Sequence, residues 1–292
     1  MDPLKLGLVS KTYFYVPVWA GLGQGIFERE GLNVTTSLLG NAPQAAPLAS
    51  GDLDVVIGTP EGVLQNAAAG GPLRIIAGNT GKLSHFVIAQ SRFKRIEDLR
   101  GARIGILGLT EGTFFHVKTV LAAHGLHFPE NYRVIETGGA PPRHKALIED
   151  KIDMGLQSVP LVYAEEDLGF SNLGEVSRYV PHWQFNTVNV SIDRALVKRD
   201  VIRRFLRAMR AATEWTHTHR EEAADIAVRE MDIERKYALR GWDYYIGNNV
   251  ITRDLSISEP GMQALIETLA SAGLLPPAAS RRAQTYIDSG FD

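Results

Sequence analysis

The 292-residue chain contains no cysteine, and this absence excludes several kinds of site at once. Without a thiol the chain has no disulfide framework, no thiolate zinc or iron–sulfur site and no cysteine nucleophile. The absence also removes the usual indicator of a reducing or an oxidising compartment. A chain of this composition is compatible with an oxidising periplasm.

The chain also lacks an excess of charge of one sign and lacks long apolar runs. Its 31 basic residues nearly balance its 33 acidic ones, which excludes the electrostatic signature of nucleic-acid binding. No apolar run approaches the roughly 20 residues that span a bilayer, so we expect no direct membrane insertion. Because Met1–Leu6 contains no signal region, the sequence leaves open a cytoplasmic protein or a periplasmic one whose leader was removed.

Short apolar runs alternate with helical stretches over the first two thirds of the chain, which is typical of α/β sheets with parallel strands. The length itself predicts two lobes or one large domain. The last ninety residues are predicted to be helical. The expected strands are Leu4–Val9, Leu32–Leu38, Leu53–Ile57, Leu73–Ala77, His85–Ala89, Arg103–Leu107, Tyr132–Glu136, Lys151–Leu156 and Asn186–Ile192, and the main expected helices are Pro17–Glu30, Glu111–His124, Pro141–Glu149, Val201–His217, Glu221–Arg229, Ile233–Ile246 and Glu259–Ala272.

One internal similarity suggests two related lobes. The segment Gly51–Thr59 is echoed 99 residues later by Asp150–Ser158, and each has an apolar-Asp pair before a strand that ends in a hydroxyl residue. Thr59 and Ser158 would then occupy equivalent strand ends in opposite lobes.

Several motifs follow one another along the chain in a recognisable order, namely Tyr13–Ala20, Gly25–Val34, Leu48–Asp54, Ile96–Gly105, Ala146–Asp153 and Phe205–Ala208 with Trp215. In these motifs and their order the chain resembles a known family, the solute-binding proteins of ABC transporters for nitrate, taurine, alkanesulfonates and thiamine-precursor pyrimidines. The resemblance covers nearly the whole chain and is not specific to one ligand.

This resemblance implies a two-lobed α/β fold of the periplasmic-binding-protein type 2, with a helical C-terminal segment and a ligand cleft between the lobes. Lobe one would comprise residues 1–90 and 192–292, and lobe two residues 91–191. The two crossovers would lie near Ala89–Arg92 and Asn189–Asp193. Ligands of open α/β sheets sit beyond the carboxyl ends of the strands, so the ligand would lie between the two lobes. The lobes would then close around it by hinge bending.

Candidate ligand-binding residues follow these expected strands. Some lie in turns before helices, where free backbone N–H groups bind polar atoms, although Asn41, Thr59 and Thr110 would equally serve as helix caps. The others offer a charge, an aromatic wall or a close backbone approach, and for them packing in the core or on the surface is the alternative. The candidates are Lys11, Tyr13, Asn41, Thr59, Glu61, Thr110, Glu111, Gly139, Ser158, Trp183 and Asn186.

Neither a metal nor a cofactor is expected. His217 and His219 are two residues apart on a predicted helix and face different directions, and the other histidines are isolated or near a turn. We therefore expect a non-enzymatic protein, monomeric, that captures a small sulfonate-, pyrimidine- or aromatic-type solute for an ABC permease. The alternative is a cytoplasmic enzyme on the same fold, such as a decarboxylase using Glu61 or Glu111 as acid or base. These carboxylates also favour a neutral or nitrogen-bearing ring over a simple sulfonate.

Overall fold

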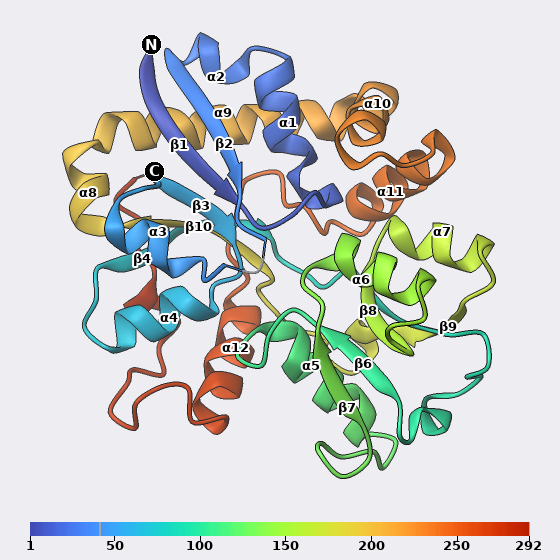
Figure 1. Cartoon of the computed structure of the whole chain (residues 1–292). Helices are drawn as coiled ribbons and strands as arrows, with labels where there is room; N and C mark the ends of the chain where they lie inside the picture. Colours follow the sequence, from blue (N-terminus) through green and yellow to red (C-terminus); the bar gives the residue numbers. More distant parts are fainter. Residues whose placement is uncertain (41, 292) are drawn as a thin grey trace.

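The computed structural model describes residues 1–40 and 42–291, which form two α/β halves, each built on one five-stranded sheet (Figure 1). This two-lobed α/β architecture confirms the expected fold class. The first sheet has the order β2-β1-β3-β10-β4 and the second the order β7-β6-β8-β5-β9. The strands are β1 (Asp2–Leu8), β2 (Leu32–Leu38), β3 (Val55–Gly58), β4 (Leu73–Thr80), β5 (His85–Ala89), β6 (Arg103–Ile106), β7 (Arg133–Glu136), β8 (Met154–Ser158), β9 (Ser171–Glu175) and β10 (Asn186–Ser191).

The two sheets share one plan. The middle strands are β3 and β8, and each is parallel to one neighbour and antiparallel to the other. Thr59 directly follows β3 and Ser158 ends β8, so the internal similarity in the sequence corresponds to equivalent places in the two sheets. The sheets are mixed rather than parallel, because β10 and β5 run against their neighbours.

The chain passes between the sheets earlier than expected. It leaves β4 of the first sheet and enters β5 of the second through residues 81–84, and it returns between β9 and β10 through residues 176–185. The expected crossovers at Ala89–Arg92 and Asn189–Asp193 are therefore displaced, because the strands beside them already belong to the next sheet. The division into lobes at residues 90 and 191 stays a prediction.

Helices cover both sheets. Their bounds are α1 (Val16–Gly23), α2 (Ile26–Arg29), α3 (Ala45–Ser50), α4 (Glu61–Ala68), α5 (Gly112–Ala122), α6 (Ala140–Ile148), α7 (Leu161–Asp167), α8 (Ile192–Val197), α9 (Arg199–Thr218), α10 (Arg220–Met231), α11 (Arg235–Gly247) and α12 (Glu259–Ser271), with short 3₁₀ turns at Tyr13–Tyr15, Ile96–Leu99, Val176–Arg178 and Ala283–Tyr286. None of them, within residues 1–40 and 42–291, has the length and apolar character needed to cross a membrane.

Local backbone chemistry corrects three helix predictions. The expected helix Pro17–Glu30 is two helices, because Gly25 adopts a left-handed conformation with φ of 64° between them. The spacing of Asn41 and Gln44 is that of a helix capping box, in which Gln44 would bond back to the helix start, but the Gln44 side chain bonds to Thr59. Thr59 does not cap α4, whose N-cap is Pro60, and its hydroxyl is used elsewhere.

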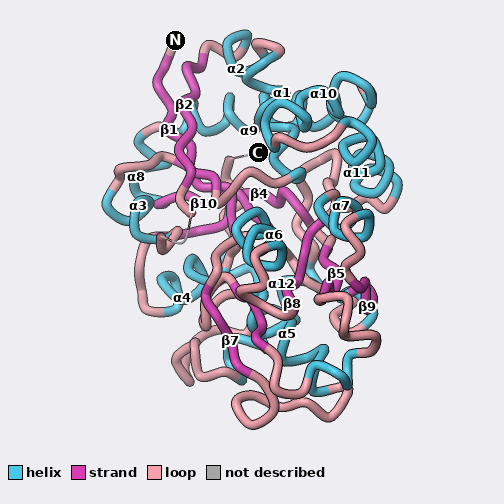
Figure 2. Tube along the Cα trace, turned by 45° about the vertical axis from the view of Figure 1, so that its right-hand side comes forward, coloured by secondary structure: helices cyan, strands magenta, loops and turns pink. Residues whose placement is uncertain are grey.

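The C-terminal helices hold the two halves together. The apolar stripe of α9 has the spacing of one helix face, with Ile202, Phe205, Leu206 and Met209 all buried. Further along the chain, α11 lies beside α7 of the second half (Figure 2). The hydroxyl of Tyr245 donates to the Val159 carbonyl at 3.0 Å, so α11 contacts the end of β8 directly.

Candidate functional site

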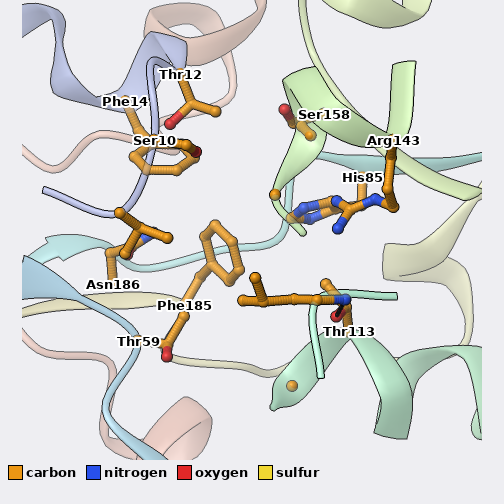
Figure 3. Close-up of a pocket in the computed structure, with 15 residues that line it drawn as sticks. Ser10, Thr12, Phe14, Thr59, His85, Thr113, Arg143, Ser158, Phe185 and Asn186 are labelled. Carbon is orange, nitrogen blue, oxygen red and sulfur yellow. Dashed lines mark hydrogen bonds between the residues drawn. The ribbon is translucent and has the colours of Figure 1, made fainter. Parts of the chain in front are cut away.

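A small cavity lies between the two halves, where loops from both sheets meet (Figure 3). The first half and the returning segment contribute Val9, Ser10, Thr12, Phe14, Thr59, Phe185 and Asn186; the second half contributes His85, Leu107, Gly112, Thr113, Gly139, Ala140, Arg143 and Ser158.

Aromatic side chains form one wall of the cavity. The rings of Phe14 and Phe185 meet edge to face with centroids 5.5 Å apart, and His85 packs edge-on against Phe185 at 4.8 Å. Edge-to-face packing fixes ring orientation and presents a rigid apolar surface. The wall suits the apolar or flat part of a small ligand.

A buried cation, Arg143 of α6, faces this wall (Figure 3). Its Nε and Nη2 donate to the Leu156 carbonyl at 3.1 and 2.8 Å, and its Nη1 donates to the Gly138 carbonyl at 2.7 Å. A guanidinium carries five N–H donors, so two remain after these bonds. Burial lowers the pKa of Arg143 to about 10, which leaves the side chain charged at neutral pH.

No carboxylate forms an ion pair with Arg143 within the described part of the chain. The acidic group that acts on it, Glu165, instead accepts a hydrogen bond from Nδ1 of His144 at 2.8 Å. Glu165 is close enough to raise the pKa of Arg143 but makes no direct ion pair with it, and a buried charge without a direct partner is costly unless a ligand supplies one. The guanidinium is therefore ready to bind a negatively charged group in the cavity.

Uncharged polar groups surround the guanidinium. Burial, followed by the nearby Arg143 charge, holds the pKa of His85 well below its usual range, so this imidazole is neutral. The Thr12 hydroxyl, Asn186 Nδ2 and His85 Nδ1 are buried without a partner among residues 1–40 and 42–291. Buried polar groups are normally hydrogen-bonded, so these atoms are free to bind a ligand or ordered water.

Thr59 links the two halves beside the cavity. Its hydroxyl donates to Oε2 of Glu111 at 2.9 Å and accepts from Nε2 of Gln44 at 3.1 Å, while its backbone N–H donates to Oε1 of Gln44 at 2.9 Å. The two halves also approach each other closely at Ser10 and Gly139, because residue 139 has no side chain. A Cβ at Gly139 would lie 3.0 Å from the Ser10 hydroxyl.

The structure brings four of the candidate residues to the cavity, namely Thr59, Gly139, Ser158 and Asn186. The others do not line the cavity. Lys11 borders a separate surface groove, and Thr110 and Glu111 border a groove next to the cavity.

The aromatic candidates are used in packing: Tyr13 stacks on Tyr245 with centroids 5.1 Å apart, and Trp183 packs against His116. Glu61 is buried but is not part of the cavity lining, and Asn41 falls outside the described residues.

Sequence reasoning missed the residues that give the cavity its chemistry: Phe14, His85, Arg143 and Phe185. In sequence, Arg143 is one of three basic residues in the run Arg143-His144-Lys145, and nothing local separates it from a solvent-facing arginine. The Gly138–Gly139 turn before α6 was the one local signal that this helix begins close to a site. No group of three acidic or histidine side chains that could hold a metal occurs among residues 1–40 and 42–291.

This chain is similar to several known proteins in sequence or in structure. A curated relative from Brucella abortus (strain 2308), named only as a binding protein, is 24% identical over 80% of this chain and 73% of its own length. The periplasmic nitrate-binding protein of Synechocystis PCC 6803 superposes with a TM-score of 0.82 at 12% identity, covering 100% of this chain and 87% of that one. The ligand-binding component of an ABC-type import system from Staphylococcus aureus superposes with a TM-score of 0.80 at 14% identity, covering 100% and 98%.

These structural matches establish the fold of periplasmic binding proteins and confirm the resemblance inferred from the motifs. The family model described as NMT1/THI5-like matches residues 14–223, which is most of the chain. The protein therefore belongs to the NMT1/THI5-like family.

Proposed function

We propose that this protein is the solute-binding component of an ABC importer and that it captures a small organic anion between its two halves. The observation that carries the proposal is Arg143, a buried guanidinium in the interlobe cavity with two donors to spare and no acidic partner among the described residues. A ligand carboxylate or sulfonate would compensate this charge with short, charge-assisted hydrogen bonds.

The apolar wall supports an organic rather than a purely inorganic anion. Phe14 and Phe185 give the cavity an apolar side opposite the guanidinium. A ligand with a compact apolar or aromatic body and one anionic group would satisfy both sides. The expectation of a neutral or nitrogen-bearing ring rested on Glu61 and Glu111, and neither lines this cavity, so we favour an anion.

The partner and the compartment follow from the same proposal. The Synechocystis relative in fold is periplasmic and the Staphylococcus aureus one belongs to an ABC-type import system. We infer a periplasmic location and delivery of the solute to an ABC permease by a monomeric protein. The ligand contacts of Thr59, Gly139, Ser158 and Asn186 are part of this proposal.

A thermal-shift screen with matched ligand pairs tests the function. We expect benzoate or benzenesulfonate to stabilise the protein and their neutral amides, benzamide and benzenesulfonamide, to leave it unchanged. A ligand at 100 times its Kd adds about 2.7 kcal/mol to the free energy of unfolding. For a chain of this size that corresponds to a rise in Tm of roughly 4–5 °C.

The same screen includes taurine, short alkanesulfonates and nitrate as anions, and pyrimidines, flavins and aromatic amides as uncharged or larger solutes. Stabilisation confined to the uncharged group would contradict an anionic ligand while leaving a binding function in place. Native mass spectrometry of freshly purified protein gives the mass of any solute already bound.

Closure of the halves around ligand is a second expected result. Only residues 81–84 and 176–185 carry the chain between the sheets, so hinge bending there is the expected motion. Small-angle scattering should give a smaller radius of gyration with the stabilising anion than without it. An unchanged radius at saturation, with binding measured separately, would rule out closure.

A further inference from the structure

Two carboxylates from opposite halves, one buried and one half-buried, lie near each other just outside the cavity lining. Glu61 is the first residue of α4 in the first half, and Glu111 directly precedes α5 in the second. The residues next to them, Thr59 and Gly112, line the cavity itself. The pair is thus assembled only where the two halves touch.

Glu111 is held across this contact. Its Oε2 accepts the Thr59 hydroxyl hydrogen at 2.9 Å, and that hydroxyl in turn accepts from Gln44 at 3.1 Å. The carboxylate of the second half is therefore tied to the turn that leads into Glu61.

Glu61 has far less support. Its side chain is 1% exposed, and neither carboxylate oxygen has a hydrogen-bond partner of normal geometry. Its Oε1 lies only 2.6 Å from the position that a Cβ at Gly112 would take. The absence of a side chain at residue 112 gives this carboxylate room against the start of α5.

The groups facing the pair supply no positive charge. From α5, His116 is buried with both ring nitrogens unpartnered, and burial lowers its pKa to about 3, so it is neutral. Trp183, in the segment before β10, offers only an unpartnered indole N–H, and Gln44 and Thr59 are uncharged. Two ionised carboxylates here would repel each other in a medium that solvates them poorly.

We propose that Glu61 and Glu111 share one proton when the halves are together, so that closure takes up a proton from solvent and opening releases it. The proposal rests on the proposed function only for the claim that closure accompanies ligand capture. Burial, and next the charge of Glu111, raise the pKa of Glu61 to about 8. Burial also raises the pKa of Glu111. The bound proton removes the repulsion between two negative charges. Because the pKa of Glu61 rises on closure from its ordinary value of 4.5 to about 8, closure and ligand affinity should weaken as pH rises between these values and level off above about 8.

The proton can be tested without any ligand because the chain has no cysteine of its own. A Cβ at Gly139 would lie 3.3 Å from the Ser10 Cβ, near the separation that a disulfide spans. The double variant Ser10→Cys/Gly139→Cys should therefore lock the halves together when oxidised and free them when reduced. Failure of this pair to cross-link would overturn the proposal, because the halves would not meet as described.

Infrared spectroscopy then compares the two redox forms at each pH. The oxidised form should show more of the carbonyl stretch of protonated carboxyls at pH 7 than the reduced form, and this difference should be lost as pH is raised through about 8. Glu165, whose pKa burial raises to about 7, contributes the same band to both forms. Adding Glu111→Gln should lower the midpoint by more than one pH unit, because the neighbouring negative charge is removed. Glu136→Gln, an exposed glutamate on the same groove as Glu111, should leave the midpoint unchanged.

Either of two results would overturn the shared proton. One is the absence, at pH 7, of any difference in the protonated-carboxyl band between the oxidised and the reduced form. The other is a midpoint that Glu111→Gln leaves in place, which would make burial of Glu61 alone the cause. Neither result bears on whether the cavity binds an anion, since no ligand is present.

Discussion

Replacing Arg143 by methionine is expected to weaken capture of the organic anion strongly. The side chain is 2% exposed and supplies the one positive charge among the residues that line the cavity. Removing one partner of a buried, hydrogen-bonded charge pair costs roughly 2–5 kcal/mol. That corresponds to a loss of affinity of about 30-fold to several thousand-fold, measured by calorimetry with the anion that stabilises the wild type.

Two further variants make this result specific. Arg143→Lys keeps the charge but not the planar fork, and it should bind more weakly than wild type and more tightly than Arg143→Met. Arg133→Met removes an exposed arginine of β7 and should bind like wild type. Because Arg143 also donates to the Gly138 and Leu156 carbonyls, circular dichroism must show that Arg143→Met is folded. Wild-type affinity in a folded Arg143→Met protein would remove this residue from the site.

The largest effect on stability is expected from Gly78→Ala. Gly78 lies in β4, and its N–H donates to the Leu255 carbonyl at 2.7 Å. A Cβ at residue 78 would lie 2.1 Å from the Ser256 carbonyl oxygen and 2.9 Å from the Ser256 carbonyl carbon. These are backbone atoms, so the strand or the loop before α12 would have to move. We expect a loss of about 3 kcal/mol in the free energy of unfolding, the upper part of the range for overpacking.

Urea unfolding monitored by circular dichroism measures this loss. The matched control is Gly81→Ala, three residues along the same segment, where the nearest atom to a new Cβ is the Thr252 Cγ2 at 3.6 Å. That distance is ordinary van der Waals contact, so Gly81→Ala should change stability by less than about 0.5 kcal/mol. Equal stabilities of the two variants would mean that the contact between β4 and the 255–256 loop is looser than described.

The periodicity and the turns of the chain indicate most of its architecture. The alternation of apolar runs with helical stretches predicts the α/β class, and the strand at residues 32–38 has the expected bounds. Gly51 ends α3 in a left-handed conformation with φ of 84°. A glycine directly after a helical stretch is enough to predict such an ending. The echo between residues 51–59 and 150–158 also predicts that Thr59 and Ser158 take equivalent places, and both line the cavity.

Local sequence could not assign the side chains their roles. Tyr13 follows β1 as expected, yet its ring packs on Tyr245 of α11, while Phe14, one residue on, reaches the cavity. Thr59 has the residue type and position of a helix cap, but Glu111 from the other half takes its hydroxyl hydrogen. Both outcomes depend on partners that are 52 residues or more distant in sequence.

Sequence alone thus determined the fold class, the family resemblance and the strand ends from which a site would be built, because period, turn chemistry and strand order are local properties. Tertiary structure decided which residues of those loops face the cleft, and above all that Arg143 faces it with no acidic partner in the described part of the chain. A helix or strand with a given apolar pattern can pack in slightly rotated positions, and each position turns different side chains toward the cavity. Only the packing of one half against the other fixes that rotation, and with it the charge of the cavity.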